Sequence, residues 1–282
     1  MTTLYVVATP IGNLRDLSMR ALDVLAAADV IAAEDTRTTR HLLAHYALGG
    51  TLVALHEHNE RDAAPRLLAL LKEGRTVALV SDAGTPAISD PGAWLVAQAR
   101  AAGVAVVPIP GPNAAITALS AAGIRAPHFL FYGFLAPRRS ARLREIAALK
   151  TLPYLLVFYE APHRVAATAA DLCEALGGER SITFARELTK RFETLHTCPL
   201  REALSWLEAD VHHQKGEFVL LVEGLLPEAA KEPVQEGERC LRVLLEELPL
   251  KQAVGLAAKL TGEGRNDLYR RALAIRAESR DA

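Results

Sequence analysis

The residues best suited to chemistry lie in polar loops that follow short apolar segments in the first 125 residues. The most informative loop spans residues 81–92 (SDAGTPAISDPG) and contains two glycines and two prolines. Glycine allows positive φ and close approach, whereas proline removes a donor and fixes φ at about −65°. Such a rigid loop is suited to hold a small ligand, with Asp82 and Thr85 contacting ribose hydroxyls or an amine. The alternative is an ordinary tight turn in which Ser89 or Asp90 caps the following helix.

Three further loops in this half carry polar side chains. Residues 9–16 (TPIGNLRD), 34–40 (EDTRTTR) and 108–113 (PIPGPN) each follow a predicted strand. In an open α/β sheet, ligands bind beyond the carboxyl ends of the strands, so these loops are expected at one edge of the sheet. His56 and His58 also follow a strand, but no acidic or cysteine partner stands at metal-ligand spacing. We interpret both histidines as surface residues.

In the second half, two clusters at strand ends place a carboxylate beside cations. They are residues 158–164 (FYEAPHR) and 186–193 (RELTKRFE). Such clusters either accept a proton and bind phosphate or form an ion-pair network at a domain interface, and spacing alone favours neither. Residues 137–144 hold four arginines, which favours contact with a polyanion over a buried interface.

Several common sites are excluded. The sequence has no GxGxxG after its first predicted strand, no GxxxxGK[ST] and no GxSxG, so a dinucleotide fingerprint, a P-loop and a nucleophile elbow lack support. Cys173, Cys198 and Cys240 stand far apart without CxxC or Cys/His spacing, which indicates buried thiols rather than disulfides or a zinc site. We therefore expect no metal.

The elements that position these loops follow from alternating apolar and helical patterns. Five strand and helix repeats in the first half predict a mainly parallel sheet covered on both faces, and two consecutive strands in the second half predict a mixed sheet. Strands are expected at residues 4–8, 30–33, 51–55, 76–80, 104–107, 129–134, 154–159, 181–185, 193–197 and 217–222. Helices are expected at 18–28 with Ser18 as N-cap, 63–72, 114–123 closing the first half, 140–149, 165–176, 200–209, 236–246, 251–260 and 266–277.

The fold class is therefore α/β, with two α/β domains and a small C-terminal helical domain of helix-turn-helix type. The 282 residues are expected to divide into an N-terminal domain at 1–125, a second domain at 126–226, a linker at 227–238 and the helical domain at 239–282. For the helical domain, a dimerisation or capping bundle is the alternative to RNA binding.

The formal net charge of −1, taken alone, argues against a nucleic-acid partner. The total is a cancellation, because residues 202–238 hold nine acidic and only two basic side chains. Basic residues exceed acidic ones by four over residues 131–201 and by three over residues 239–282. These two basic segments are where we expect a polyanionic partner.

No apolar run reaches the roughly 18 residues that span a bilayer. The N-terminus begins without a basic leader and small-residue cleavage site. We therefore expect a cytoplasmic protein without a membrane partner.

Seven motifs, in order, resemble the small-subunit ribosomal RNA methyltransferases of the tetrapyrrole methylase superfamily. They are residues 4–16 (LYVVATPIGNLRD), 33–39 (AEDTRTT), 81–92, 110–113 (PGPN), 158–164, 186–193 and 215–224 (KGEFVLLVEG). The resemblance covers about residues 3–225, and residues 248–273 resemble the C-terminal helix-turn-helix segment of that family.

The resemblance implies two α/β domains of tetrapyrrole-methylase type with S-adenosylmethionine in the cleft between them, in a homodimer. It implies 2'-O-methylation of a cytidine in the decoding region of 16S rRNA within the 30S subunit. The superfamily often has Gly-Asp-Pro where this chain has Gly84-Thr85-Pro86, so Asp82 is expected to take the role of that aspartate. The other cofactor contacts that it implies are Pro10, Ala83, Gly84, Thr85, Ile88, Asn113, Ala114, Glu160 and Leu188.

Methyl transfer to a ribose hydroxyl is an in-line displacement with a neutral leaving group, so positioning supplies much of the rate. A general base helps because the hydroxyl is a weak acid, and the candidates are Asp35, Glu187 and Glu160. Lys190 or Arg37 would lower the pKa of the hydroxyl. Asp35, Arg37, Glu187 and Lys190 form the expected catalytic set, with the first two on the substrate side of the cleft.

Two other functions fit parts of the sequence. A methyltransferase acting on a tetrapyrrole would also bind a polyanion, but a small substrate needs no basic C-terminal bundle. A non-catalytic RNA-binding protein that senses the cofactor would bind the cofactor tightly without turnover.

Overall fold

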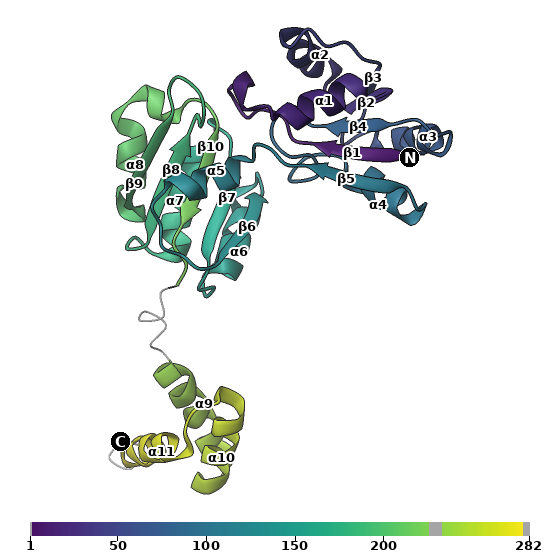
Figure 1. Ribbon diagram of the computed structural model, residues 1–282. Helices are drawn as coiled ribbons and strands as arrows, with labels where there is room; N and C mark the ends of the chain where they lie inside the picture. The colour runs from purple at the N-terminus through teal and green to yellow at the C-terminus, as the bar shows by residue number, and fades with distance from the viewer. Residues whose placement is uncertain (1, 226–232, 279–282) are drawn as a thin grey trace. The chain divides into compact units, whose positions relative to one another are not determined.

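The computed structural model describes residues 2–225 and 233–278. They divide into two compact units. One unit comprises the described residues up to Lys150 together with Tyr154–Glu223, and the other comprises Thr151–Pro153 and the described residues from Gly224 onward. The first unit holds two five-stranded sheets, and the second holds three helices that pack together (Figure 1). Within these residues, no helix is long and apolar enough to span a bilayer.

The first sheet is parallel throughout, as the sequence predicts, with strand order β3-β2-β4-β1-β5. Because the strands run in one direction, the loops that follow them lie at one edge. The strands are β1 (Thr3–Val7), β2 (Val30–Ala33), β3 (Leu52–Ala54), β4 (Val77–Val80) and β5 (Ala105–Ile109).

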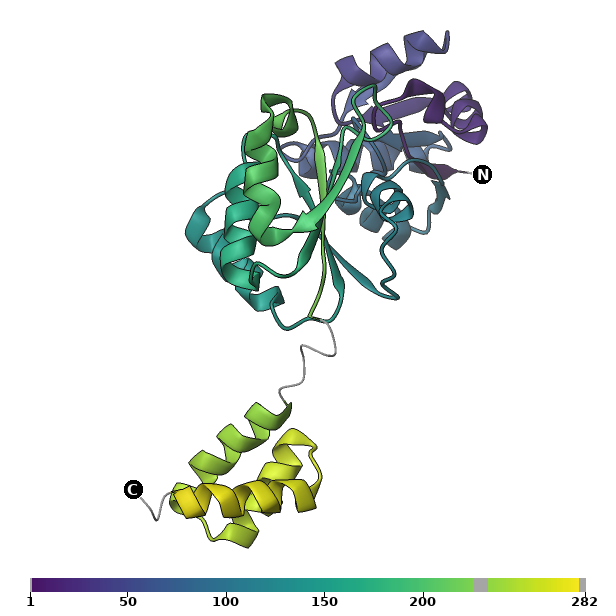
Figure 2. The ribbon, with the colours of Figure 1, turned by 90° about the vertical axis from the view of Figure 1, so that its left-hand side faces the viewer.

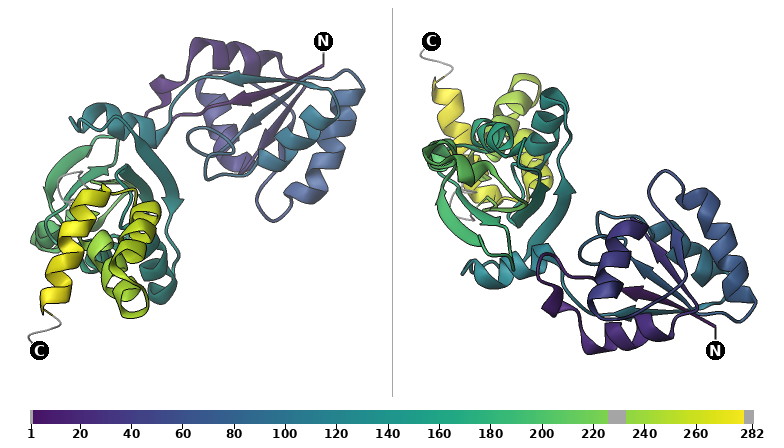
Figure 3. Two further views of the ribbon diagram at one scale, coloured as in Figure 1. Left: turned by 90° about the horizontal axis from the view of Figure 1, so that it is seen from below. Right: turned by 90° about the horizontal axis from the view of Figure 1, so that it is seen from above.

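Helices cover both faces of this sheet, because neighbouring residues of a strand point to opposite faces. On β2, Val30 and Ala32 pack in one core with α3 and α4, whereas Ile31 and Ala33 pack in a second core with α1 and α2. The left view of Figure 3 shows the helices on both sides. Their bounds are α1 (Met19–Ala27), which has Ser18 as its N-cap, α2 (Thr36–His45), α3 (Glu60–Lys72) and α4 (Ala93–Ala101).

The second sheet is mixed, which confirms the prediction, and its strand order is β6-β7-β10-β8-β9. Only β6 and β7 pair in parallel, while β10 runs antiparallel between β7 and β8, and β9 is antiparallel to β8. The strands are β6 (Phe129–Phe134), β7 (Leu155–Glu160), β8 (Ser181–Arg186), β9 (Thr194–Pro199) and β10 (Phe218–Val222).

Helix α5 (Ala114–Ala121) belongs to the core of this second sheet rather than closing the first half. Its Ala115 and Ala118 pack with Val157 and Val219. Figure 2 shows helices on the opposite face as well, where Trp206 of α8 stacks on Phe184 with ring centroids 4.9 Å apart. The remaining helices of the unit are α6 (Arg139–Leu149), α7 (Val165–Leu176) and α8 (Leu200–Ala209).

The second unit is built from α9 (Pro233–Glu247), α10 (Leu250–Thr261) and α11 (Arg265–Glu278). Its core holds six buried side chains, namely Leu241, Val254, Ala257, Leu268, Ala272 and Ile275. Gly262, with φ of 73°, ends α10 in the left-handed conformation that favours glycine. Helix α9 begins inside the predicted linker 227–238, and residues 226–232 lie outside the described residues, so the domain boundaries stay predictions.

Candidate functional site

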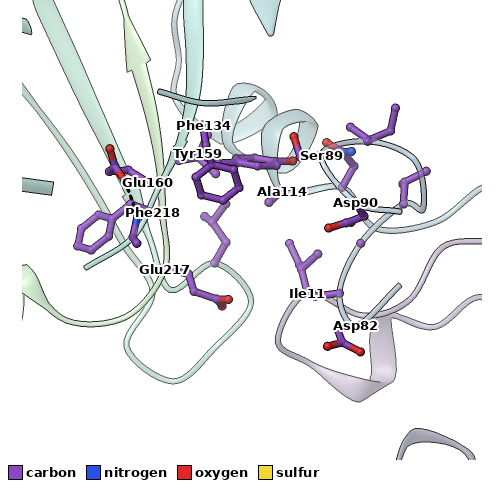
Figure 4. Close-up of a pocket in the computed structure, with 18 of the residues that line it drawn as sticks. Ile11, Asp82, Ser89, Asp90, Ala114, Phe134, Tyr159, Glu160, Glu217 and Phe218 are labelled. Atoms are coloured by element: carbon purple, nitrogen blue, oxygen red, sulfur yellow. Dashed lines mark hydrogen bonds between the residues drawn. The ribbon is translucent and has the colours of Figure 1, made fainter. Parts of the chain in front are cut away.

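A cavity of about 430 Å³ lies within the first unit (Figure 4). One wall comes from the loops that follow β1, β2 and β4 and from the start of α5. The other wall comes from the ends of β6 and β7, the residues that follow β8 and the start of β10. The volume is that of a small-molecule site, and the sheet edge is where an α/β fold binds ligands.

The loop at residues 81–92 is pinned to its neighbours. The backbones of Thr9 and Gly84 exchange two hydrogen bonds of 2.8 and 3.0 Å, and Gly84 has a positive φ of 83°. The Thr85 hydroxyl donates to the Pro112 carbonyl at 3.1 Å. This hydroxyl therefore fixes the loop, and Thr85 is also one of the residues that line the cavity.

Neither Ser89 nor Asp90 caps the helix that follows the loop. The Glu60 carboxylate, from α3, instead accepts hydrogen bonds from the backbone N–H groups of Gly92 at 2.9 Å and Trp94 at 3.0 Å. The first turn of α4 is thus capped from another helix, and Ser89 and Asp90 line the cavity instead.

Three carboxylates gather on the wall formed by the first sheet. A Glu34 oxygen accepts the Asp82 N–H at 3.2 Å, and an Asp82 oxygen accepts the Asp35 N–H at 3.0 Å. Burial raises the pKa of Glu34 and of Asp82. Burial, together with the negative charges of Glu34 and Asp82, raises the pKa of Asp90 to about 6. This acidic wall (Glu34, Asp82 and Asp90) is suited to a ligand that carries positive charge.

Lys190 lines the wall formed by the second sheet and bridges two carboxylates. Its Nζ lies 2.8 Å from Glu187 Oε1 and also contacts Glu217. Burial works against the charge of Glu187, but the hydrogen bonds from Lys190 and from the Glu217 N–H, together with the positive charges of Lys190 and Arg186, outweigh it and lower the pKa of this carboxyl. Gly12 lies so close to Lys190 that a Cβ at that position would fall 2.5 Å from Cγ.

The two strand-end clusters differ in what they do. Glu160 is 3% exposed, and its oxygens accept from the Ala161 N–H at 2.8 Å and the Thr168 hydroxyl at 2.6 Å, with Arg164 Nε 3.2 Å away. This is a structural network, although Glu160 also lines the cavity. In the other cluster, buried Arg186 donates to the carbonyls of two loops, whereas Lys190 faces the cavity.

The structure brings together ten of the fourteen predicted site residues as cavity lining. They are Asp82, Ala83, Gly84, Thr85, Ile88, Asn113, Ala114, Glu160, Leu188 and Lys190. The other four adjoin the lining without forming it: Pro10 precedes Ile11, Glu187 holds Lys190, the Asp35 N–H donates to Asp82, and Arg37 pairs with Asp35.

Asp35 and Arg37 begin helix α2, where the sequence analysis expected a loop. Asp35 is the N-cap, and its carboxylate accepts the Arg37 N–H at 2.8 Å and the Arg37 guanidinium at 2.6 Å. These hydrogen bonds lower the pKa of Asp35 to about 2. The Arg37 side chain is 82% exposed, so it is open to an anion in solvent.

Several lining residues are not among the site residues predicted from the sequence, including Glu34, Asp90, Phe134, Tyr159 and Glu217. Glu34 and Asp90 stand in the loops at 34–40 and 81–92, but their pKa values are raised first by burial and then by neighbouring carboxylates, and both depend on the fold. Phe134 ends a predicted strand, and the glycine before it is the one signal of an irregularity there.

The structure contradicts part of the prediction that the arginines of segment 137–144 contact a polyanion. Arg142 is 4% exposed, and its Nε donates to buried Asp171 at 2.7 Å. Arg139 also pairs with Asp171, at 3.0 Å. Two of the four arginines therefore stabilise the contact between α6 and α7. Arg142 is the buried one, whereas Arg138, Arg139 and Arg144 are exposed.

The cysteines and histidines differ in part from the predicted exposure. Cys198 is buried, but Cys173 and Cys240 are only half-buried, so the expectation of three buried thiols is wrong for two of them. His58 is exposed as expected, whereas His56 is half-buried with Nδ1 unpaired. Across residues 2–225 and 233–278, no group of three or more His, Cys, Asp or Glu side chains is arranged to hold a metal ion.

Two family models match the chain. Residues 3–204 match the model of the tetrapyrrole (corrin/porphyrin) methylases, and residues 231–276 match the RsmI C-terminal HTH domain. The first match covers the first sheet and all of the second except β10, and the second match covers most of the helical unit.

Curated relatives match over nearly the whole chain. The protein named ribosomal RNA small subunit methyltransferase I from Escherichia coli O157:H7 is 50% identical over 270 residues, which is 96% of this chain and 94% of that protein. The protein of the same name from Pseudomonas aeruginosa is 50% identical over 272 residues, or 96% of each chain.

Solved structures share the fold at lower identity. Uroporphyrin-III-C-methyltransferase from Thermus thermophilus is 22% identical with a TM-score of 0.56, over 82% of this chain and 98% of that chain. A structure of uroporphyrin-III C-methyl transferase from the same organism, complexed with S-adenosylhomocysteine, is 19% identical with a TM-score of 0.55, over 78% of this chain and 96% of that chain. They confirm the predicted fold class.

Proposed function

Because this chain belongs to the tetrapyrrole methylase family, and within it to the ribosomal RNA small subunit methyltransferase I proteins, we propose that it methylates 16S rRNA with S-adenosylmethionine as donor. The finer proposal is 2'-O-methylation of a cytidine in the decoding region, within the 30S subunit. The observation that carries the proposal is the sequence identity of about 50% to these proteins over 96% of the chain. The loops that carry the predicted motifs line one cavity, which supports it.

The cavity suits a donor that carries positive charge. The acidic wall (Glu34, Asp82 and Asp90) complements a sulfonium and an ammonium group, because opposite charges attract strongly in a partly buried site. Small side chains at Ala83 and Ala114 leave room for an adenosine. When bound, S-adenosylmethionine supplies an activated methyl group. The proposed cofactor contacts are those that the family resemblance implies, namely Pro10, Asp82, Ala83, Gly84, Thr85, Ile88, Asn113, Ala114, Glu160 and Leu188.

The carboxylates suggested as proton acceptors are not equivalent. Asp35 is a weak base with a pKa of about 2, and Glu160 has both oxygens occupied by hydrogen bonds. We assign the hydroxyl proton to Glu187, because its Oε1 accepts a hydrogen bond from Lys190, which lines the cavity, although the same contact lowers the pKa of Glu187. Lys190 then stabilises the negative charge that develops on the ribose oxygen. Exposed Arg37, fixed by Asp35, is assigned to the RNA backbone on the substrate side.

The helical unit is proposed to bind the RNA. Its exposed cations include Lys251, Lys259, Arg265 and Arg276, and cations that neutralise phosphates supply much of the affinity for RNA. A homodimer and a cytoplasmic location belong to the same proposal, and rest on the family resemblance and on the ribosomal substrate.

The proposal is tested by offering two acceptors. The protein is incubated with labelled S-adenosylmethionine and either 30S subunits from cells that lack this modification or uroporphyrinogen. We expect label in the 16S RNA and none in the tetrapyrrole. Label in uroporphyrinogen alone, or tight cofactor binding without transfer to the 30S subunit, would overturn the proposal.

A further inference from the structure

Phe134 is an apolar ring left half in solvent at the cavity. It is the last residue of β6, its exposed fraction is 53%, and it lines the wall formed by the second sheet. Figure 4 shows Phe134 beside Tyr159 at the centre of the cavity view. An aromatic face held open at a ligand site is available for stacking on another flat ring.

A β-bulge in β6 determines the orientation of the Phe134 side chain. The pairing of β6 with β7 shifts between Phe131 and Gly133, so that Tyr132 is the extra residue and Gly133 has a positive φ of 80°. In a regular strand, residues 131 and 134 point to opposite faces. Here Phe131 is paired with Val157 and Phe134 with Tyr159, which share one face of β7. The bulge therefore places Phe134 on the face that leads to the cavity.

Neighbouring rings hold Phe134 in place. The centroids of Phe134 and Tyr159 are 5.6 Å apart with an interplanar angle of 65°, and Tyr159 contacts Phe131 in the same way at 5.0 Å. The Tyr159 hydroxyl accepts the N–H of Ala115 at 3.3 Å, which ties this cluster to the start of α5. Because Tyr159 holds the ring on one side and the ring is still 53% exposed, Phe134 is pre-organised for a partner.

We infer that Phe134 is the stacking platform for the base of the nucleotide whose ribose is methylated. The inference rests on the proposed function and deepens it. An unpaired RNA base binds proteins chiefly by stacking on aromatic side chains. The cationic part of the donor is proposed to bind the acidic wall, which lies across the cavity from Phe134. Because Phe134 is half-exposed, a substrate that enters from solvent can reach it. Exposed Arg138, four residues on, is a cation of the kind that accompanies stacking in single-strand sites.

The test uses the full chain and three variants. Phe134→Leu keeps an apolar side chain but removes the ring, Phe134→Trp restores a ring, and Phe129→Leu is the matched control. Phe129 begins the same strand, is 47% exposed and does not line the cavity. The measurements are the 30S concentration at half-maximal methyl transfer, at saturating S-adenosylmethionine, and the affinity for S-adenosylmethionine alone by calorimetry.

We expect Phe134→Leu to raise the half-saturating 30S concentration by roughly 5-fold to 150-fold, the effect of about 1–3 kcal/mol of stacking. Phe134→Trp and Phe129→Leu should stay within about threefold of the parent, and affinity for S-adenosylmethionine should not change in any variant. Weaker binding of S-adenosylmethionine by Phe134→Leu, with an unchanged 30S dependence, would assign the ring to the adenine of the cofactor and overturn the inference. No change in either measurement would also overturn it. Transfer by none of the proteins, the parent included, would instead be a failure of the proposed function, and the inference would fall with it.

Discussion

The pKa of Asp90 is raised to about 6, first by burial and then by the negative charges of Glu34 and Asp82, its neighbours on the acidic wall. Three carboxylates that share a partly buried wall do not ionise together without mutual repulsion. A cationic ligand relieves that repulsion and favours the ionised form of Asp90. Binding of such a ligand is therefore linked to release of a proton.

Affinity for S-adenosylmethionine is accordingly expected to depend on pH. Below a pH of about 6, Asp90 is protonated in the free protein, so cation binding must displace a proton; above it, the carboxylate is already ionised. We expect affinity to rise by up to about tenfold between pH 5 and pH 8, which corresponds to one unit of pKa change on binding. Calorimetry at the two pH values measures it.

S-Adenosylhomocysteine and two variants provide the controls. The product lacks the sulfonium charge, so its affinity should rise less over the same pH range. Asp90→Asn should flatten the rise for S-adenosylmethionine, whereas Asp23→Asn, at an exposed position on α1, should not. Equal pH dependence for donor and product would contradict the role given to the acidic wall.

Glu187 and Glu217 both contact Lys190. Substituting each in turn distinguishes a carboxylate that accepts the proton from one that only positions Lys190. If Glu187 accepts the proton, Glu187→Gln should lower the single-turnover rate by about 100-fold or more while leaving affinity for S-adenosylmethionine unchanged. The Glu217 side chain is 74% exposed, and Glu217→Gln removes its charge beside the same ammonium, so its effect should stay below about tenfold. Equal losses would mean that both carboxylates only position Lys190.

At this scale, the sequence predicts residues that belong to local motifs, and ten of the fourteen proposed line the cavity. It does not predict residues whose character arises from distant neighbours. The pKa of Asp90 depends on Glu34, which is 56 positions away, and Phe134 enters the cavity because of a register shift. The buried pair of Arg142 and Asp171 likewise appears only when α6 packs on α7.

Among the elements, Gly92 shows how the wall at residues 81–92 is kept in place. Its φ is 125°, and a Cβ there would lie 2.6 Å from Cδ2 of Leu79, a core side chain of β4. Gly92→Ala combines backbone strain of about 1–3 kcal/mol with crowding of the core. We expect a loss of at least about 2 kcal/mol in the free energy of unfolding, measured with urea.

Gly103 is the matched control for that substitution. It also has a positive φ, of 72°, but no atom lies within 4 Å of the position that a Cβ would take there. Gly103→Ala should cost only the left-handed backbone penalty of about 1 kcal/mol. A cost for Gly92→Ala no larger than for Gly103→Ala would show that contact with Leu79 does not matter.

Elements with a strong apolar pattern follow the sequence closely: β2, β6, α7 and α8 have the expected bounds. Helix α2 was missed, because its first turn (TRTTR) is polar and its β-branched threonines favour helix weakly. The partner of α5 was also missed. A helix of small residues packs against either sheet equally well by composition, and only the tertiary fold places its alanines on the second sheet.

Across the whole molecule, the net charge of −1 conceals an uneven distribution of basic and acidic residues along the chain. The excess of basic residues at 131–201 is partly used internally, since Arg139 and Arg142 pair with Asp171. In the helical unit, Arg265 and Arg276 of α11 are exposed, and so are Tyr269 and Leu273 of the same helix. Arg265, Tyr269 and Leu273 repeat at intervals of four, so they share one face of α11.

Two exposed arginines of α11 test the role of this unit within the full chain. The double variant Arg265→Ala, Arg276→Ala should weaken binding of the 30S subunit and reduce the slope of log affinity against log salt by about 1.4, or roughly 0.7 per lost phosphate contact. Affinity for S-adenosylmethionine should not change. Lys72→Ala, at an exposed position on α3, is the control. An unaltered salt slope in the double variant would favour a purely structural role for the bundle.

The product nucleoside identifies the atom of the RNA that receives the methyl group. After transfer of labelled methyl from S-adenosylmethionine to 30S subunits, the 16S RNA is digested completely to nucleosides and separated against standards. We predict that the label co-migrates with 2'-O-methylcytidine. Label on a base-methylated nucleoside, or on the ribose of another nucleoside, would rule out 2'-O-methylation of a cytidine by this protein.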